Sequence, residues 1–208
     1  MKTLFISLVL LISLNSSIAQ TNKFFYFDSG HNQITEEAFN AKLESHEFLE
    51  IPGKNENEKQ LVARENHGII VNTDKIYDLL QEHTDEEISR KKPLVILFYP
   101  GKDDNNSGGA NDKLSLRIWR NKLWKGLDDI AGVKPIYIYK DKNGLKKYRK
   151  IITWYPDPES FFENNFFQHH YPGYSFVVIS PEGEYISYFG EFPKEFVWEA
   201  TKQLIPIK

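Results

Sequence analysis

The chain contains no cysteine in its 208 residues. Thiol–disulfide exchange, peroxide reduction by a thiolate and metal binding through thiolates all use sulfur as the reacting or ligating atom. The sequence therefore excludes these three kinds of chemistry, and it also excludes stabilisation by disulfides. Stability must come from a hydrophobic core, for which 15 Phe, 11 Tyr and 4 Trp supply large side chains.

Long apolar runs, repeats and common catalytic motifs are also missing. After the first 20 residues, no apolar run approaches the roughly 20 residues of a membrane-spanning helix. Serine-hydrolase, P-loop and dinucleotide-binding fingerprints do not occur. The sequence therefore predicts no transmembrane segment in the mature chain and no cofactor.

The N-terminus has the pattern of a targeting segment. Lys2 precedes an apolar run over residues 4–14, and the small residue Ala19 ends a stretch typical of a cleavage site. The alternative, a membrane-anchoring helix, is disfavoured because the run is too short to span a bilayer. We expect residues 1–19 to be a signal peptide and the mature protein to be periplasmic or secreted.

Charge is unevenly distributed along the chain, although the net charge is only −3. Residues 113–150 carry twelve Lys and Arg against three acids, whereas residues 24–90 carry fifteen acids against six bases. The basic segment either meets an anionic partner or surface, or pairs with the acidic flanks and is otherwise solvated. Nucleic acid is disfavoured as a partner by the expected export and the acidic total.

The first part of the mature chain, residues 20–92, is expected to form an α+β extension. An aromatic strand is predicted at 24–27, and Thr35 is placed to cap a helix that ends near residue 43. Residues 61–64 and 68–71 are predicted to pair as a hairpin.

The pattern changes at residue 93. Leu94–Tyr99 is apolar without alternation, which is typical of a strand buried on both faces. A polar loop follows, and then an amphipathic helix over 116–130 that is closed by Gly132. Further on, the sequence predicts a strand at 135–139, a helix at 157–168, a hairpin formed by 174–179 and 185–189, and a helix that begins after Pro193.

The order strand, helix, strand, helix, hairpin, helix resembles the thioredoxin-like fold over about residues 92–205. The most specific stretch is 175–190, which is similar to the final hairpin of that superfamily and ends at Gly190. The resemblance implies an α/β protein whose residues 93–208 form a three-layer α/β/α sandwich.

The resemblance does not supply a reactive site. Family members carry cysteine in the loop after the first strand, which corresponds here to residues 101–112, and a cis-proline before the hairpin. At the proline position this chain has Tyr174, with Pro172 two residues earlier. The resemblance therefore implies a redox-inactive member that acts as a binding or assembly module for a protein, peptide or glycan. The expected binding face comprises Tyr99, Asp103, Asp104, His169, His170, Tyr171 and Tyr174, and Trp154 and Tyr155 are further candidates for an exposed contact patch.

A metal site is the alternative hypothesis. Asp103 and Asn105 match the start of an EF-hand loop, but the twelfth position is Leu114 rather than a bidentate Glu. His169 and His170, together with acids of this loop such as Asp112, are candidate ligands of a metal-dependent enzyme or metal-binding protein. Adjacent histidines rarely bind one metal, so a solvated loop and a helix-capping His pair are the favoured interpretations. The sequence thus favours a binding module over an enzyme.

Overall fold

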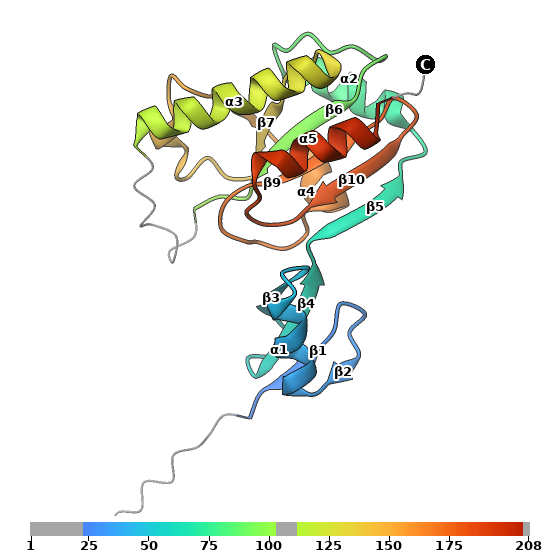
Figure 1. Ribbon diagram of the computed structural model, residues 1–208, viewed down its shortest axis with the longest axis vertical. Coiled ribbons are helices and arrows are strands. Elements are labelled where there is room, and N and C mark those ends of the chain that lie inside the picture. The colour runs from blue at the N-terminus through green and yellow to red at the C-terminus, as the bar shows by residue number, and fades with distance from the viewer. Residues whose placement is uncertain (1–22, 103–111, 206–208) are drawn as a thin grey trace, which may run out of the picture.

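The computed structural model describes residues 23–102 and 112–205, which form two mixed sheets with helices packed on them (Figure 1). The predicted α/β class is confirmed. The expected signal peptide, residues 1–19, and the candidate residues Asp103, Asp104 and Asn105 lie outside the described residues. Within the described part, no helix is long and apolar enough to cross a membrane.

The larger sheet has six strands in the order β5-β10-β9-β6-β7-β8. Strand β6 is parallel to β7 and antiparallel to β9, so Leu97 lies opposite Tyr137 on one side and Phe176 on the other. All six residues of β6 are buried, as predicted from its uninterrupted apolar sequence. The strands are β5 (Glu65–Ile69), β6 (Leu94–Tyr99), β7 (Ile136–Tyr139), β8 (Tyr155–Pro156), β9 (Ser175–Ile179) and β10 (Glu184–Tyr188).

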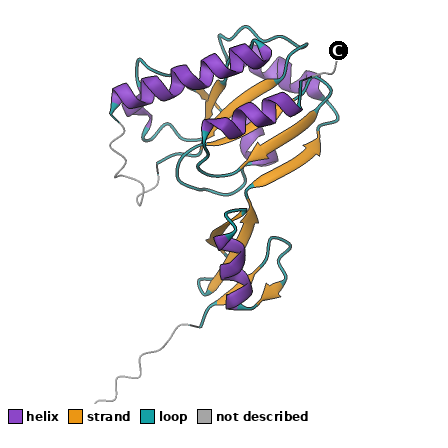
Figure 2. Ribbon diagram, in the orientation of Figure 1, coloured by secondary structure: helices purple, strands orange, loops and turns teal. Residues whose placement is uncertain are grey.

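Helices cover both faces of this sheet (Figure 2). Val95 and Leu97 face α3 (Lys113–Ala131) and α5 (Lys194–Gln203), whose buried side chains belong to the same core cluster. Ile96 and Phe98 face α2 (Thr73–His83) and α4 (Phe161–Phe166) in a second cluster. Between β7 and α4 the chain also forms two short 3-10 helices, Leu145–Tyr148 and Pro158–Ser160.

Helix α3 ends at Gly132 as predicted, but it begins at Lys113, earlier than the predicted residue 116. The Asp112 side chain caps its first turn, and Gly132 ends it in the left-handed region at φ 61°. Leu116, Leu123 and Leu127 are its buried residues and recur with helical spacing. The predicted hairpin of β9 and β10 and the C-terminal helix are confirmed as well.

The smaller sheet has the order β2-β1-β4-β3, with α1 (Glu36–Glu44) on one face. Thr35 caps α1 as predicted, and the buried Phe39 of this helix contacts Tyr26 with 5.0 Å between ring centroids. The strands are β1 (Phe25–Phe27), β2 (Gln33–Ile34), β3 (Phe48–Pro52) and β4 (Glu58–Ala63).

The predicted hairpin of residues 61–64 and 68–71 is wrong. Strand β4 pairs with β1 and β3, whereas β5 pairs with β10 of the larger sheet. Residues 65–67 include no positive φ of the kind that a tight hairpin turn requires. They form strand β5 instead, and the chain passes from one sheet to the other at Arg64. Consequently β5 and α2, which we expected in the extension ending at residue 92, pack with the larger sheet.

Candidate functional site

Two residues of the expected binding face meet at the carboxyl end of β6. Tyr99 is the last residue of this strand, and Tyr174 immediately precedes the neighbouring strand β9. Their ring centroids are 6.1 Å apart in an edge-to-face arrangement. The parallel strands β6 and β7 both have their carboxyl ends at this end of the sheet, which is where ligands commonly bind in α/β proteins.

Four further aromatic side chains complete what we call the tyrosine–tryptophan cluster. Trp154 is central, because its ring lies 5.3–5.8 Å from four tyrosine rings. Trp119 of α3 closes one side at 6.4 Å from Tyr174. Tilted and edge-to-face contacts at these distances are the favoured geometries of aromatic pairs. The cluster comprises Tyr99, Trp119, Tyr137, Tyr148, Trp154 and Tyr174.

Three polar atoms inside this cluster are buried without a hydrogen-bond partner. They are the hydroxyls of Tyr137 and Tyr174 and Nε1 of Trp154. The Tyr99 hydroxyl, by contrast, donates to the Asn143 carbonyl oxygen at 2.9 Å. Buried polar groups are normally paired, and an unpaired one costs about 1–3 kcal/mol. The concentration of these unpaired atoms at the carboxyl end of the sheet distinguishes this end from the rest of the described core.

Burial also determines the ionisation state of these tyrosines. It raises the pKa of Tyr99 to about 12, with smaller contributions from Tyr148 and Asp141. Burial likewise raises the pKa of Tyr137 and, together with the nearby Tyr148, that of Tyr174. All three phenols are therefore neutral at physiological pH. The cluster offers neutral hydrogen-bond donors and apolar rings, which suit binding better than nucleophilic or base catalysis.

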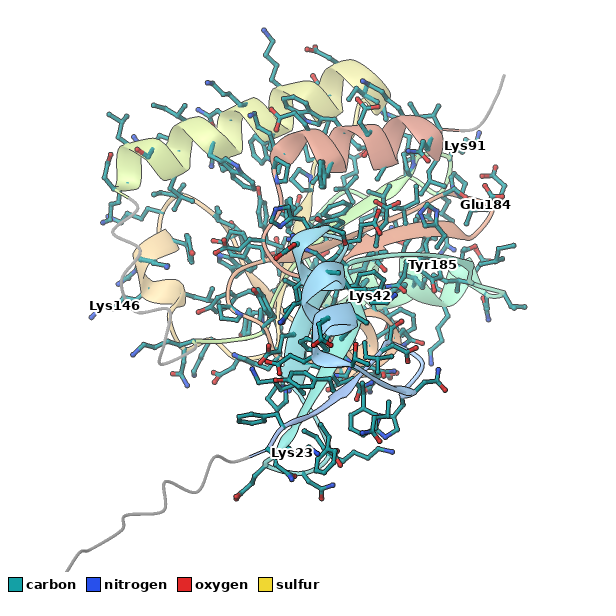
Figure 3. The ribbon with its side chains drawn as sticks, turned by 60° about the horizontal axis from the view of Figure 1, so that its bottom comes forward. Lys23, Lys42, Lys91, Lys146, Glu184 and Tyr185 are labelled. Atoms are coloured by element: carbon teal, nitrogen blue, oxygen red, sulfur yellow. The ribbon has the colours of Figure 1, made fainter. Side chains whose placement is uncertain are left out.

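Exposed apolar and basic side chains lie beside the cluster. On the first turns of α3, Leu114 is 62% exposed and Ile118 is 46% exposed. Basic residues of the 3-10 helix that contains Tyr148 point outward, and Figure 3 shows Lys146 at the rim of the molecule. Among the described residues, one ion pair joins the basic segment 113–150 to an acid, that of Lys140 with Glu163. Within the described residues, most of this positive charge is therefore not paired with the acidic flanks.

Two other residues of the expected face, His169 and Tyr171, lie on the other side of the sheet. His169 and Tyr171 pack against Phe189, with ring centroids 6.1 and 5.6 Å from it. Phe189 belongs to the core cluster under α2 and α4, whereas Tyr174 packs on the cluster under α3 and α5. Partial burial of the imidazole lowers the pKa of His169, although the residue as a whole is exposed. His170, next in the chain, is exposed as well.

Asp112, the described acid of the candidate metal loop, serves to cap α3. Its carboxylate accepts hydrogen bonds from the backbone N–H of Leu114 at 2.5 Å and from the Ser115 hydroxyl at 3.0 Å. The same two contacts lower its pKa. In the described ranges, 23–102 and 112–205, no three His, Asp or Glu side chains come together in a way that would hold a metal ion.

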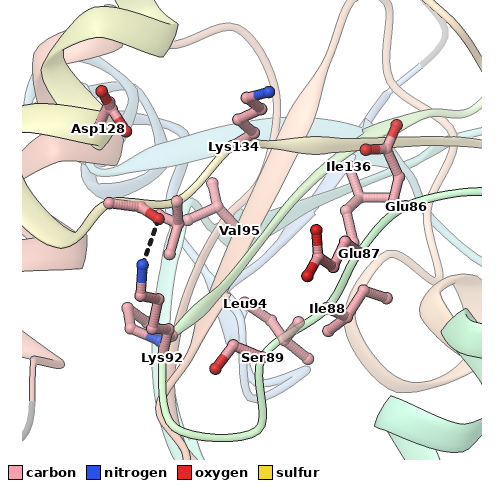
Figure 4. Close-up of a pocket in the computed structure, with 13 residues that line it drawn as sticks. Glu86, Glu87, Ile88, Ser89, Lys92, Leu94, Val95, Asp128, Lys134 and Ile136 are labelled. Carbon is pink, nitrogen blue, oxygen red and sulfur yellow. Dashed lines mark hydrogen bonds between the residues drawn. The ribbon is translucent and has the colours of Figure 1, made fainter.

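A separate hollow of about 580 Å³ lies at the opposite, amino ends of β6 and β7 (Figure 4). Leu94, Val95 and Ile136 form its apolar floor, and Lys92 donates from Nζ to the Gly132 carbonyl oxygen at 2.7 Å on one side. Glu87 and other side chains of both charge signs line it. The sequence analysis did not predict this hollow.

The sequence analysis also missed the parts that Trp119, Tyr137 and Tyr148 play in the cluster. The sequence did contain a signal for two of the aromatic residues. The segment that follows β7 begins at the carboxyl end of the sheet, so its aromatic residues are expected near this end. Tyr148 and Trp154 both lie in it.

Comparison with known proteins gives no family for this chain. No protein-family model matches it, and no curated protein matches its sequence.

Proposed function

We propose that the chain is an exported, non-catalytic protein of the thioredoxin-like superfamily that acts as a binding or assembly module. The strand order β7-β6-β9-β10 supports this, because the first pair is parallel and joined through α3 and the last two strands form a hairpin followed by α5. That is the arrangement the sequence resemblance implies. The partner is a protein, a peptide or a glycan.

The tyrosine–tryptophan cluster is the observation that carries the proposal. It lies at the end of the sheet where members of the superfamily carry their thiols. The cluster provides neutral phenols and unpaired donors, and the exposed Leu114 and Ile118 lie beside it. Without a sulfur atom, this end of the sheet recognises a partner through apolar contact and hydrogen bonds.

The superfamily assignment is tested by restoring the missing thiols. Asp112 caps α3 and Ser115 follows three residues later, which is the spacing of a Cys-x-x-Cys motif at a helix N-terminus. The double variant Asp112→Cys/Ser115→Cys should form a reducible disulfide and gain dithiothreitol-dependent insulin reduction. The control Lys122→Cys/Lys125→Cys, with the same spacing on the exposed middle of α3, should gain none. Equal activity of the two variants would contradict the assignment.

The binding role is tested on peptide and glycan arrays. The wild-type chain should bind a defined subset of probes, and Leu114→Glu/Ile118→Glu should lose them because two charges are placed beside the cluster. Phe24→Glu/Phe25→Glu, which changes two exposed apolar side chains of the smaller sheet, should keep them. No binding by the wild type, or equal loss in both variants, would argue against this face.

Export is tested by expressing the chain with its own N-terminus and fractionating the cells. Mass spectrometry should identify a mature protein that begins at Gln20, outside the cytoplasm. An intact chain retained in the cytoplasm would refute this part of the proposal.

A further inference from the structure

Strand β5 forms the outer edge of the six-stranded sheet, and in the described part of the chain no strand pairs with its free side (Figure 1). Phe189 N donates to Arg64 O and Ile70 N donates to Gly183 O, so even-numbered residues turn their backbone groups toward β10. Because these groups alternate along a strand, the N–H and C=O of Glu65, His67 and Ile69 point outward. These backbone groups form an open row along the edge.

The side chains of this edge are unusually apolar at one end. Ile69 is 70% exposed, and Val71, in the bend that follows the strand, is 99% exposed. Natural edge strands are normally protected by Lys, Pro, a bulge or a covering segment. In β5 the row from Glu65 to Ile69 contains neither Lys nor Pro, so the edge has the properties of a docking site.

The same edge is acidic. Glu184 lies directly opposite Ile69 in the ladder, its side chain is at the rim in Figure 3, and Glu182 is exposed in the adjoining turn. Within the described residues, neither carboxylate forms an ion pair with Lys or Arg, and Glu65 contacts His67 at 2.6 Å. If a second copy of this chain paired with this edge, the acidic side chains of the two copies would lie near one another and repel. A partner with basic side chains is complementary in charge to this edge.

We propose that β5 binds an extended, basic peptide segment of a partner protein, which adds as an antiparallel outer strand. Backbone hydrogen bonds to Glu65, His67 and Ile69 provide affinity, and alternate side chains of the peptide provide specificity. One apolar residue of the peptide lies opposite Ile69, a second one two positions before it contacts Val71 in the adjoining bend, and a Lys or Arg lies opposite Glu65. The recognised pattern is therefore apolar-x-apolar-x-x-x-basic. This surface is independent of the tyrosine–tryptophan cluster.

The test uses the labelled peptide acetyl-Val-Thr-Val-Thr-Thr-Thr-Lys-amide and fluorescence anisotropy. N-methylation at its third and fifth positions, whose N–H groups point toward β5, should weaken binding by about tenfold or more, because each lost bond costs on the order of 1 kcal/mol. N-methylation at the second and fourth positions, which point away, should preserve binding. Hydrogen exchange at the amides of His67 and Ile69 should slow when the peptide binds.

Matched protein variants locate the contact. Ile69→Lys/Val71→Lys should abolish binding, whereas Leu114→Lys/Ile118→Lys on α3 should leave it unchanged. Glu65→Lys should weaken the binding of this peptide and should strengthen the binding of a peptide that has Glu in place of Lys at its last position. The proposal is overturned if the wild type does not bind the peptide, if both N-methylation patterns act alike, or if a concentration-dependent dimer is lost on changing Ile69 and Val71.

Discussion

Gly126 of α3 lies directly against the indole ring of Trp198 in α5. A Cβ atom at position 126 would be 2.3 Å from Trp198 Cε2, and the Trp198 Nε1–H donates to the Leu123 carbonyl oxygen at 3.2 Å. The two helices that cover one face of the larger sheet are therefore in contact at a point where only glycine fits.

Gly126→Ala should destabilise the protein by about 1–3 kcal/mol, the usual cost of overpacking, despite the better helix propensity of alanine. Urea unfolding followed by circular dichroism measures this change. In a Trp198→Leu background the same substitution should cost little, because the steric conflict is gone. An equal cost in both backgrounds would contradict the contact.

Arg64 fastens the smaller sheet to the larger one. Its guanidinium donates to the carbonyl oxygens of Phe189 at 3.4 Å, His46 at 3.5 Å and Glu191. Arg64→Lys removes this planar set of donors and should cost about 1–2 kcal/mol. Hydrogen exchange should accelerate more in β1, β3 and β4 than in β6. Arg90→Lys, which alters an exposed pair with Asp74 and Asp78, should change stability by less than about 0.5 kcal/mol.

Much of the fold could be predicted because local signals agreed with the tertiary environment. The uninterrupted apolar run Leu94–Tyr99 indicated a central strand, and the spacing of Leu116, Leu123 and Leu127 with Gly132 behind them indicated α3 and its end. The fate of β5 could not be predicted in this way. Its sequence does not tell whether it pairs with β4 or with β10, because strand partners depend on contacts distant in the sequence.

The candidate site could be predicted only in part for a related reason. Tyr99 and Tyr174 flank strands whose order was expected, so their meeting followed from topology. His169 and Tyr171 are close to Tyr174 in sequence, yet they lie on the opposite face of the sheet. The chain passes from one face to the other at the end of the sheet near Gly173, where φ is 94°. Sequence proximity alone does not indicate on which face a loop residue packs.

Removing an unpaired hydroxyl should not cost stability. Tyr137→Phe and Tyr174→Phe should be neutral or stabilising, because the folded state loses a buried group without a partner. Tyr77→Phe is the control: its hydroxyl donates to the Lys92 carbonyl oxygen at 3.1 Å, and its loss should cost about 1 kcal/mol. Midpoints of urea unfolding give the comparison. A clear loss in the two cluster variants would mean that these hydroxyls are paired in solution.

The same tyrosines should make the fold sensitive to alkali. An unfolded tyrosine has a pKa of about 10, whereas burial raises the pKa of Tyr99 to about 12 and also raises those of Tyr137 and Tyr174. Between these values the unfolded chain has released protons that the folded chain retains. The stabilising contribution is therefore complete below about pH 10 and falls as the pH rises toward the folded pKa.

This dependence is measured by urea unfolding at a series of pH values from 8 to 11, with tyrosinate absorbance recorded in parallel. The wild type should lose stability above about pH 10, and the buried tyrosines should ionise together with unfolding. The Tyr137→Phe/Tyr174→Phe variant should show a shallower decline, because two of the titrating phenols are gone while every lysine remains. Parallel curves for the two proteins would assign the alkaline loss to other groups and leave the cluster with no part in it.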